Sequence, residues 1–134
     1  VCSSDLDVLA VIRHVQAGNP GVPLALAGFS FGAFIQTRAV QQLAGAGEPV
    51  AHLILAGMPA GALSETLSYD TPPVPPHALV VHGEHDERVP LANVLNWARP
   101  QELPVVVLPG GGHFFTGKLP KLRQVVEGYL KRPV

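Results

Sequence analysis

The stretch LALAGFSFGAF, residues 24–34, places a serine between two glycines directly after a short apolar run. Residues 23–27 are typical of a strand buried on both faces, and the pattern from Phe31 onward is helical. A G-x-S-x-G sequence between a strand and a helix indicates a nucleophile elbow, a sharp turn whose close packing leaves no room for side chains beside the serine. Ser30 is therefore a candidate nucleophile. The alternative is that Ser30 only caps the helix that follows it.

The hydrophobic pattern around this stretch predicts strands that alternate with helices. We expect strands at residues 23–27, 52–56, 78–82 and 104–108. We expect helices over residues 6–15, 31–43, 90–98 and 119–130. Apolar strands separated by helices are typical of a parallel sheet with right-handed crossovers. The predicted fold class is therefore α/β, with a mostly parallel sheet of about four strands flanked by helices. Residues 57–76 are expected to form a long loop, which is functional or partly disordered.

Composition limits the classes of protein that remain. The chain has 134 residues, 47% of them hydrophobic and 14% charged, which argues for one folded domain and against disorder. Its apolar runs are too short to span a bilayer, and its net charge of −1 comes from scattered charges. We therefore expect no nucleic-acid partner and no membrane partner. The single cysteine, Cys2, excludes an internal disulfide framework, and without a signal-peptide pattern the expected location is cytoplasmic. The oligomeric state is not predicted.

A serine hydroxyl is a weak nucleophile without a base, so a catalytic serine needs a histidine and a carboxylate nearby. Asp86 follows the third predicted strand within HGEHDERVP, and His113 follows the fourth within LPGGGHFF. Groups that act on a ligand in α/β sheets lie beyond the carboxyl ends of the strands. Ser30, Asp86 and His113 each come directly after a strand, which predicts that the three side chains meet.

These three motifs together resemble the small, lidless bacterial hydrolases of the α/β-hydrolase superfamily. The shared patterns are the GFSFGA elbow, HGE-x-D-x-x-VP and PG-x-x-HFF, and the resemblance covers nearly the whole chain from about Asp7. It implies a serine hydrolase of the carboxylesterase kind that acts on a small-molecule ester through an acyl-enzyme. It also implies that Ser30 is the nucleophile, His113 the general base and acid, and Asp86 the residue that orients His113. The backbone N–H of Phe31 would be one oxyanion-hole donor. No cofactor and no metal are expected.

The chain departs from the family pattern at its N-terminus. Residues 1–6, VCSSDL, read like the translation of a sequencing adapter, and we predict that they are an artefact or scar. An ordinary processed or cropped terminus is the alternative. Residues 7–134 are then expected to form a single α/β-hydrolase domain that lacks the N-terminal strands and has an exposed edge at its first strand. The second oxyanion donor would be absent from the chain. One lost donor costs about 3 kcal/mol of transition-state stabilisation, so we expect weak or no activity.

Two other functions stay open at this point. One is a non-catalytic fragment or binding module that keeps the hydrolase scaffold. The other is a metallohydrolase that uses His82, His85 and Asp86, since histidine and carboxylate groups bind zinc. Asp86 has a simpler alternative role as a cap for the helix that starts near Pro90, and His82 is expected to be packed against its strand or to cap.

The remaining candidate residues surround the proposed site in sequence. Glu84 and Glu87 are rival acids, and the run 110–112 of three glycines is expected to give its loop the freedom to bring a histidine over the serine. Phe114 or Phe115 is expected to form an apolar acyl pocket. Three other histidines are expected at the surface or at helix ends: His14, His52 and His77.

Overall fold

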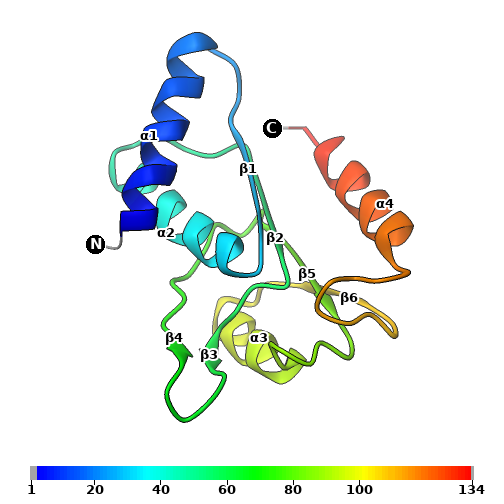
Figure 1. The fold of residues 1–134 in the computed structure, drawn as a ribbon. Coiled ribbons are helices and arrows are strands. Elements are labelled where there is room, and N and C mark those ends of the chain that lie inside the picture. Colours follow the sequence, from blue (N-terminus) through cyan, green and yellow to red (C-terminus); the bar gives the residue numbers. More distant parts are fainter. Residues whose placement is uncertain (1–2, 134) are drawn as a thin grey trace.

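The computed structural model describes residues 3–133 and has one central sheet with helices on both faces (Figure 1). The sheet contains, in spatial order, β1 (Ala25–Phe29), β2 (His52–Ala56), β5 (Leu79–Gly83) and β6 (Val105–Leu108), all parallel. The helices are α1 (Ser3–Gly18), α2 (Phe31–Gly45), α3 (Leu91–Ala98), the 3₁₀ turn η1 (Arg99–Gln101) and α4 (Leu119–Leu130). The predicted four-stranded α/β fold is confirmed. The bounds of β2 are the expected ones, and those of the other strands differ by at most two residues, the usual scatter at the ends of elements.

Side chains of the central strands alternate between two hydrophobic layers. Leu53 and Leu55 of β2 pack in the core beneath α1, α2 and α3, whereas Ile54 and Ala56 face α4. Successive strand residues point to opposite faces of a sheet, so a strand buried on both faces must be apolar throughout. In the described part of the chain, none of the helices has the length and apolar character needed to cross a membrane.

Helix α4 is joined to the sheet by a buried tyrosine. The hydroxyl of Tyr129 accepts a hydrogen bond of 2.9 Å from the backbone N–H of Leu53. The Tyr129 ring also packs edge-on against the ring of His52, with 5.2 Å between centroids. His52 is half-buried at the start of the expected strand and is neither a fully exposed nor a helix-end residue. A strand N–H that has no acceptor in a neighbouring strand is satisfied in this way by a side chain.

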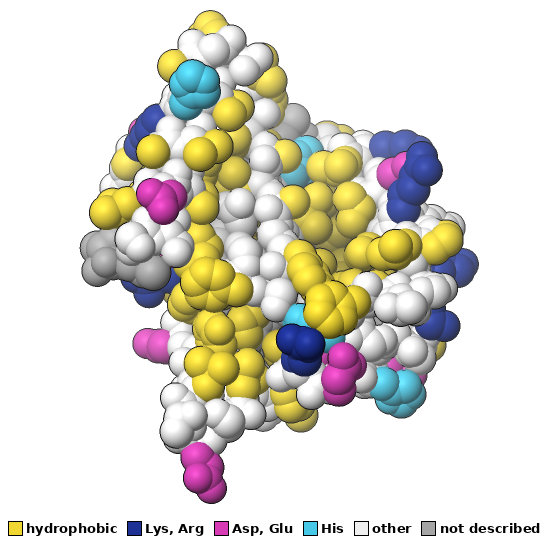
Figure 2. All heavy atoms as spheres, in the orientation of Figure 1, with side chains coloured by type: hydrophobic (Ala, Val, Ile, Leu, Met, Phe, Trp, Pro, Cys, Tyr) yellow, Lys and Arg dark blue, Asp and Glu magenta, His cyan; other side chains and the backbone are white. Residues whose placement is uncertain are grey.

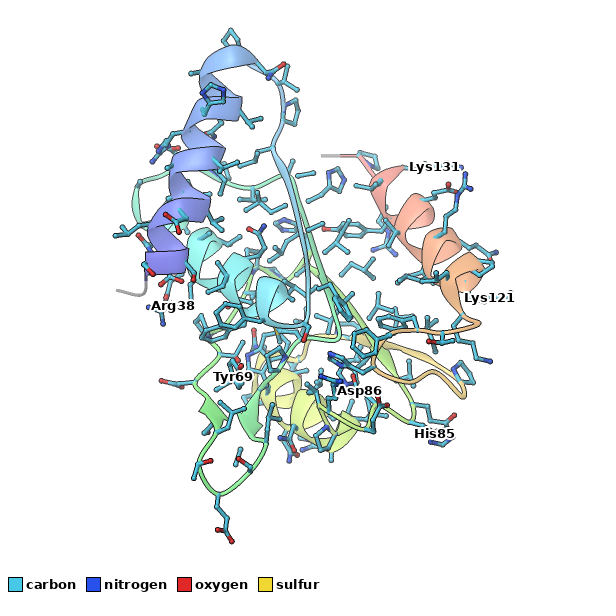
Figure 3. All side chains as sticks on the ribbon, in the orientation of Figure 1. Arg38, Tyr69, His85, Asp86, Lys121 and Lys131 are labelled. Atoms are coloured by element: carbon cyan, nitrogen blue, oxygen red, sulfur yellow. The ribbon has the colours of Figure 1, made fainter. Side chains whose placement is uncertain are left out.

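Helix α1 is joined to α2 by an ion pair that is buried at its carboxylate. Arg38 Nε donates to Asp5 Oδ2 at 2.6 Å, and the Asp5 side chain has no exposed surface (Figure 3). Asp5 belongs to the stretch that was predicted to be an artefact or scar. The origin of residues 1–6 stays a prediction, and Val1 and Cys2 lie outside the described residues.

Residues 57–76 are more ordered than a plain loop. They contain a small antiparallel hairpin of β3 (Gly61–Ala62) and β4 (Ser68–Tyr69). Two side chains of α3 hold the segment: Asn93 Nδ2 donates to the carbonyls of Ala60 and Ala62, and Trp97 Nε1 donates to those of Thr71 and Pro72. Sequence periodicity did not predict these tertiary contacts, because they join residues about 25 to 33 positions apart.

Strand β1 lies at one edge of the sheet, as predicted, and within residues 3–133 it pairs only with β2. Its residues Ala25, Ala27 and Phe29 are exposed. Figure 2 shows hydrophobic side chains gathered on the face between α1 and α4, and a hollow of about 590 Å³ opens there beside Leu24, His52 and Tyr129. An apolar edge strand of this kind is a place where further chain can pair.

We expect Tyr129→Phe to lower the free energy of unfolding by about 1–3 kcal/mol, because the buried N–H of Leu53 would lose its acceptor. Urea denaturation followed by circular dichroism measures this loss. Tyr69→Phe is the matched control, since the Tyr69 hydroxyl makes no hydrogen bond within residues 3–133, and its effect should stay below about 0.5 kcal/mol. Equal effects of the two substitutions would contradict this role of Tyr129.

Candidate active site

Ser30 occupies the turn between β1 and α2 in a strained backbone conformation. Its φ is 53° and its ψ is −125°, a region that costs a non-glycine residue about 1–3 kcal/mol. The Ser30 N–H donates to the carbonyl of Ala56, at the end of β2, over 2.9 Å. Its side chain makes no capping hydrogen bond to α2, so the reading of Ser30 as only a side-chain cap is wrong. The turn instead presents the hydroxyl at the carboxyl edge of the sheet.

The two glycines beside Ser30 have different surroundings. A Cβ atom on Gly28 would lie 2.6 Å from backbone atoms of Gly32 and Ala33, a distance that real structures do not tolerate. A Cβ atom on Gly32 would meet nothing within 4 Å, because Gly32 lies on the exposed side of α2. The expectation that both glycines leave no room for a side chain is therefore right for Gly28 and wrong for Gly32.

Asp86 lies in the loop after β5 with its side chain fully buried. Its Oδ1 accepts the backbone N–H groups of Arg88 and Val89, at 2.9 and 2.7 Å. Its Oδ2 lies 2.8 Å from Nδ1 of His113. The capping alternative is thus half right: one oxygen stabilises the loop before α3, while the other faces the histidine. Two backbone donors hold the carboxylate in one orientation.

His113 is brought to Asp86 by two loops that cross at very short range. A Cβ atom on Gly83 would lie 2.5 Å from the carbonyl oxygen of Gly111, so only glycine fits there. The N–H of His85 donates to that same carbonyl over 2.8 Å. The run 110–112 shows the expected conformational freedom at Gly110, whose φ is 68°. Its small residues allow close packing against the loop of Asp86.

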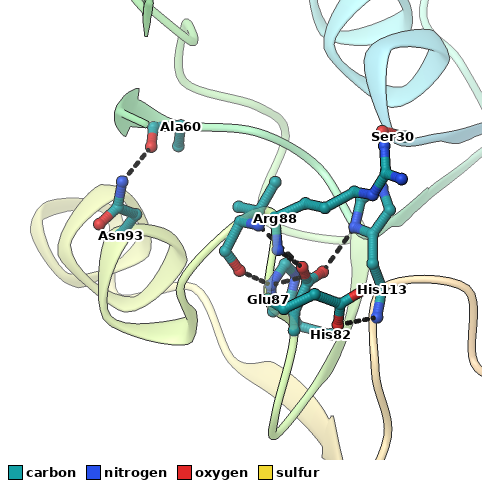
Figure 4. A network of polar contacts seen from close by, with 9 residues as sticks. Ser30, Ala60, His82, Glu87, Arg88, Asn93 and His113 are labelled. Carbon is teal, nitrogen blue, oxygen red and sulfur yellow. Dashed lines mark hydrogen bonds and ion pairs between the residues drawn. The ribbon is translucent and has the colours of Figure 1, made fainter. Parts of the chain in front are cut away.

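Ser30, His113 and Asp86 form one chain of hydrogen-bonding distances (Figure 4). Nε2 of His113 lies 2.9 Å from Oγ of Ser30, and the histidine is only 3% exposed. An ionised carboxylate can only accept hydrogen bonds, so Nδ1 of His113 is assigned the proton and Nε2 is left to accept from the serine hydroxyl. The arrangement can accept a proton from Ser30 and stabilise the resulting imidazolium.

The backbone N–H of Phe31 lies at the start of α2, directly after Ser30. The first N–H groups of a helix have no carbonyl one turn earlier to bond, and they carry the positive end of the helix dipole. Phe31 is therefore a helix N-terminal donor next to Ser30 in sequence, the position for which the family resemblance implies an oxyanion-hole donor.

Phe29 and Phe31 adjoin the serine in sequence, and Phe29 and Phe114 pack against the histidine. Phe29 packs on His113 and Phe114 with centroid distances of 5.2 and 5.9 Å. Phe29, Phe31 and Phe114 are 42%, 47% and 54% exposed. Phe115, in contrast, is buried in the layer beneath α4, so the expectation that it could line an acyl pocket is wrong, and only Phe114 of that pair faces the surface.

His82 and His85 do not meet around a common point. The side chain of His85 is 70% exposed and lies on the outer side of its loop, 3.6 Å from Glu84 (Figure 3). His82 is buried, and its Nε2 lies 2.8 Å from the carbonyl of Val89, in agreement with the expected packed role. Among residues 3–133, no group of three histidine, cysteine or acidic side chains is arranged to hold a metal ion.

Glu84 and Glu87, considered from sequence as rival acids, hold the histidine loop. Glu84 Oε2 accepts the N–H of Gly110 at 2.7 Å, and Glu87 Oε2 lies 3.3 Å from the N–H of His113. Their carboxylates thus bind backbone, while Asp86 binds the imidazole. The sequence signal for this role was weak, because only the crossing of the two loops brings these groups together.

This fold is that of the α/β hydrolases. The sequence profile of the α/β hydrolase family matches residues 3–90, and the chain belongs to this family. Among the curated proteins that were searched, none matches the chain.

Solved structures agree with this assignment. A lidless α/β serine hydrolase from Xanthomonas campestris is 35% identical, with a TM-score of 0.79, and the match covers 96% of this chain and 56% of that protein. An α/β serine hydrolase homologue from Coxiella burnetii is 35% identical, with a TM-score of 0.67, covering 89% of this chain and 54% of that one. A protein of unknown function from Agrobacterium tumefaciens shares the fold at 24% identity, with a TM-score of 0.78, covering 94% of this chain and 58% of that one. The chain thus spans a little over half the length of these three proteins.

The two elbow glycines provide a matched test of the packing at Ser30. We expect Gly28→Ala to lower the free energy of unfolding by about 1–3 kcal/mol or more, because the clash is with backbone that no side-chain rotation can relieve. Gly32→Ala should change it by no more than about 1 kcal/mol and in the stabilising direction, since alanine favours the helix. Urea denaturation of both variants gives the comparison. A destabilising Gly32→Ala or a neutral Gly28→Ala would contradict the geometry described for the elbow.

Proposed function

We propose that this chain is a serine hydrolase that cleaves a small-molecule ester or a related acyl bond. The observation that supports this most is the continuous chain from Ser30 Oγ through His113 to the buried Asp86 carboxylate. The 35% identity to a lidless serine hydrolase points to the same reaction class. Because the chain spans little more than half of that relative, activity and substrate are proposals for the protein as a whole.

The proposed reaction begins at the serine. As Ser30 Oγ attacks the carbonyl carbon, its proton passes to Nε2 of His113, and the Asp86 carboxylate stabilises the imidazolium that forms. The carbonyl oxygen becomes an oxyanion that accepts a hydrogen bond from the N–H of Phe31. Collapse of the tetrahedral intermediate breaks the ester bond, and the leaving alcohol takes the proton from His113.

Water completes the cycle. It gives a proton to Nε2 of His113 and attacks the acyl group on Ser30. The second tetrahedral intermediate releases the carboxylic acid, and the proton returns from His113 to Ser30. The chain of hydrogen bonds is restored without any cofactor.

A fluorophosphonate probe tests the nucleophile directly. We expect the wild-type chain to gain one probe adduct and Ser30→Ala to gain none, because the probe reacts only with an activated serine hydroxyl. Intact-mass spectrometry measures the adduct. Ser68→Ala, at an exposed serine of β4, is the control and should label like the wild type. Labelling that persists in Ser30→Ala, or a wild-type chain that does not label, would refute the proposal.

We expect the site to prefer esters with apolar acyl groups, since exposed rings of Phe29, Phe31 and Phe114 flank the serine. Phe114→Ala should raise KM for such esters by about tenfold, the effect of losing part of one buried aromatic contact. A series of p-nitrophenyl esters of increasing chain length gives the measurement. Val22 is an exposed apolar residue before β1, so it lies at the amino-terminal end of the strands, away from Ser30. The control substitution Val22→Ala should leave KM unchanged. If KM does not depend on acyl length, this part of the proposal fails.

A further inference from the structure

A second histidine lies directly behind Asp86. His82, in β5, has no exposed surface, and its Nε2 lies 3.3 Å from Oδ2 of Asp86 and 2.8 Å from the carbonyl oxygen of Val89 (Figure 4). The proposed reaction does not use this residue. Oδ2 is also the oxygen that lies 2.8 Å from Nδ1 of His113, so it sits between two imidazole rings.

The surroundings of His82 assign its proton. Nε2 faces two acceptors, a carbonyl and a carboxylate, so it must carry hydrogen. The other ring nitrogen, Nδ1, is buried and has no partner in the described part of the chain. A proton on Nδ1 would be a buried donor without an acceptor, which costs more than a lone pair left free. The neutral tautomer with hydrogen on Nε2 is therefore the one that fits.

With that proton, each oxygen of the Asp86 carboxylate has its own donors. Oδ1 accepts the N–H groups of Arg88 and Val89. Oδ2 accepts from His113, and Nε2 of His82 lies 3.3 Å from the same oxygen. Both backbone donors lie on Oδ1. His82 is fixed in β5 beside Oδ2, so its Nε2–H can restrain the second oxygen as well.

We propose that His82 is a positioning residue for the site: its Nε2–H holds Oδ2 of Asp86 in line with Nδ1 of His113. This inference rests on the proposed function. His82 touches neither the serine nor any reacting atom, and it acts through Asp86. The simpler role is that His82 only ties Val89 to β5, which would stabilise the loop without affecting turnover.

The first test is the tautomer of His82 in the unmodified chain, read from long-range ¹⁵N–¹H NMR correlations of its ring. We expect hydrogen on Nε2 and none on Nδ1. Hydrogen on Nδ1 alone would overturn the proposal, because a bare Nε2 cannot hold a carboxylate. This measurement needs no turnover, so it stands even if the chain fails to react with esters or with a fluorophosphonate, which would count against the proposed function alone.

The second test compares substitutions by steady-state hydrolysis of a p-nitrophenyl ester. His82→Leu removes the donor and should lower kcat roughly 10- to 100-fold with KM within about twofold, the range for one hydrogen bond to a charged group. His82→Gln keeps an N–H at a similar reach and should restore kcat to within about threefold of the wild type. His77→Leu is the matched control. Nε2 of His77 also contacts a backbone carbonyl, that of Val50 at 3.0 Å. His77 precedes β5, whereas Asp86 follows it, so the two residues lie at opposite ends of that strand.

The outcomes separate the two roles of His82. A kcat that falls in His82→Leu and returns in His82→Gln, with His77→Leu unchanged, supports positioning. Folded His82→Leu with wild-type kcat, or equal losses in the Leu and Gln variants, would overturn it. If His82→Leu does not fold, hydrogen on Nδ1 alone still overturns the proposal, and a His82→Gln variant whose kcat falls tenfold or more overturns it as well.

Discussion

The parallel pairing of β1, β2, β5 and β6 is the constraint on which the rest of this structure depends. Because all four strands run the same way, their carboxyl ends meet at one edge, and the loops that follow β1, β5 and β6 must converge there. Ser30, Asp86 and His113 come from these three loops, and they are 27 to 83 residues apart in the chain. No local interaction could bring them within hydrogen-bonding distance. The parallel direction of the strands is therefore what brings the three side chains of the site together.

The loops converge at the carboxyl ends of the strands, which requires close approaches between backbone segments. Glycine occupies two of these positions. β1 meets α2 at Gly28, and the loop after β5 meets the loop after β6 at Gly83. At the first of these points the chain also stores strain in Ser30, which the surrounding strands hold in place. The cost in stability is offset by burial on both faces of the sheet. Rigid packing is what keeps the hydroxyl, the imidazole and the carboxylate aligned.

Asp86 is the hub of the polar network, and its environment explains how a carboxylate can be buried here. It receives two backbone N–H groups, the imidazole of His113 and, in our proposal, the N–H of His82. A buried charge is tolerated when each of its oxygens is paired with donors. Glu84 and Glu87 also hold His113 in place, because their carboxylates accept backbone N–H groups of the loop that carries it.

The sequence by itself predicted the order of strands and helices along the chain and the turn at Ser30, because periodicity and turn chemistry are local properties of the chain. It also singled out Asp86 and His113 as candidate partners of Ser30, because each follows a predicted strand. It misjudged what depends on neighbours distant in sequence. Gly32 was expected to be crowded and is open, Phe115 was one of two candidates for an acyl pocket and is buried in the core, and residues 57–76 form a hairpin held by Asn93 of α3. Only the tertiary structure decided these points, and only it placed His82 against Asp86, since contact between segments follows from how the sheet brings them together and not from the residues that flank each one.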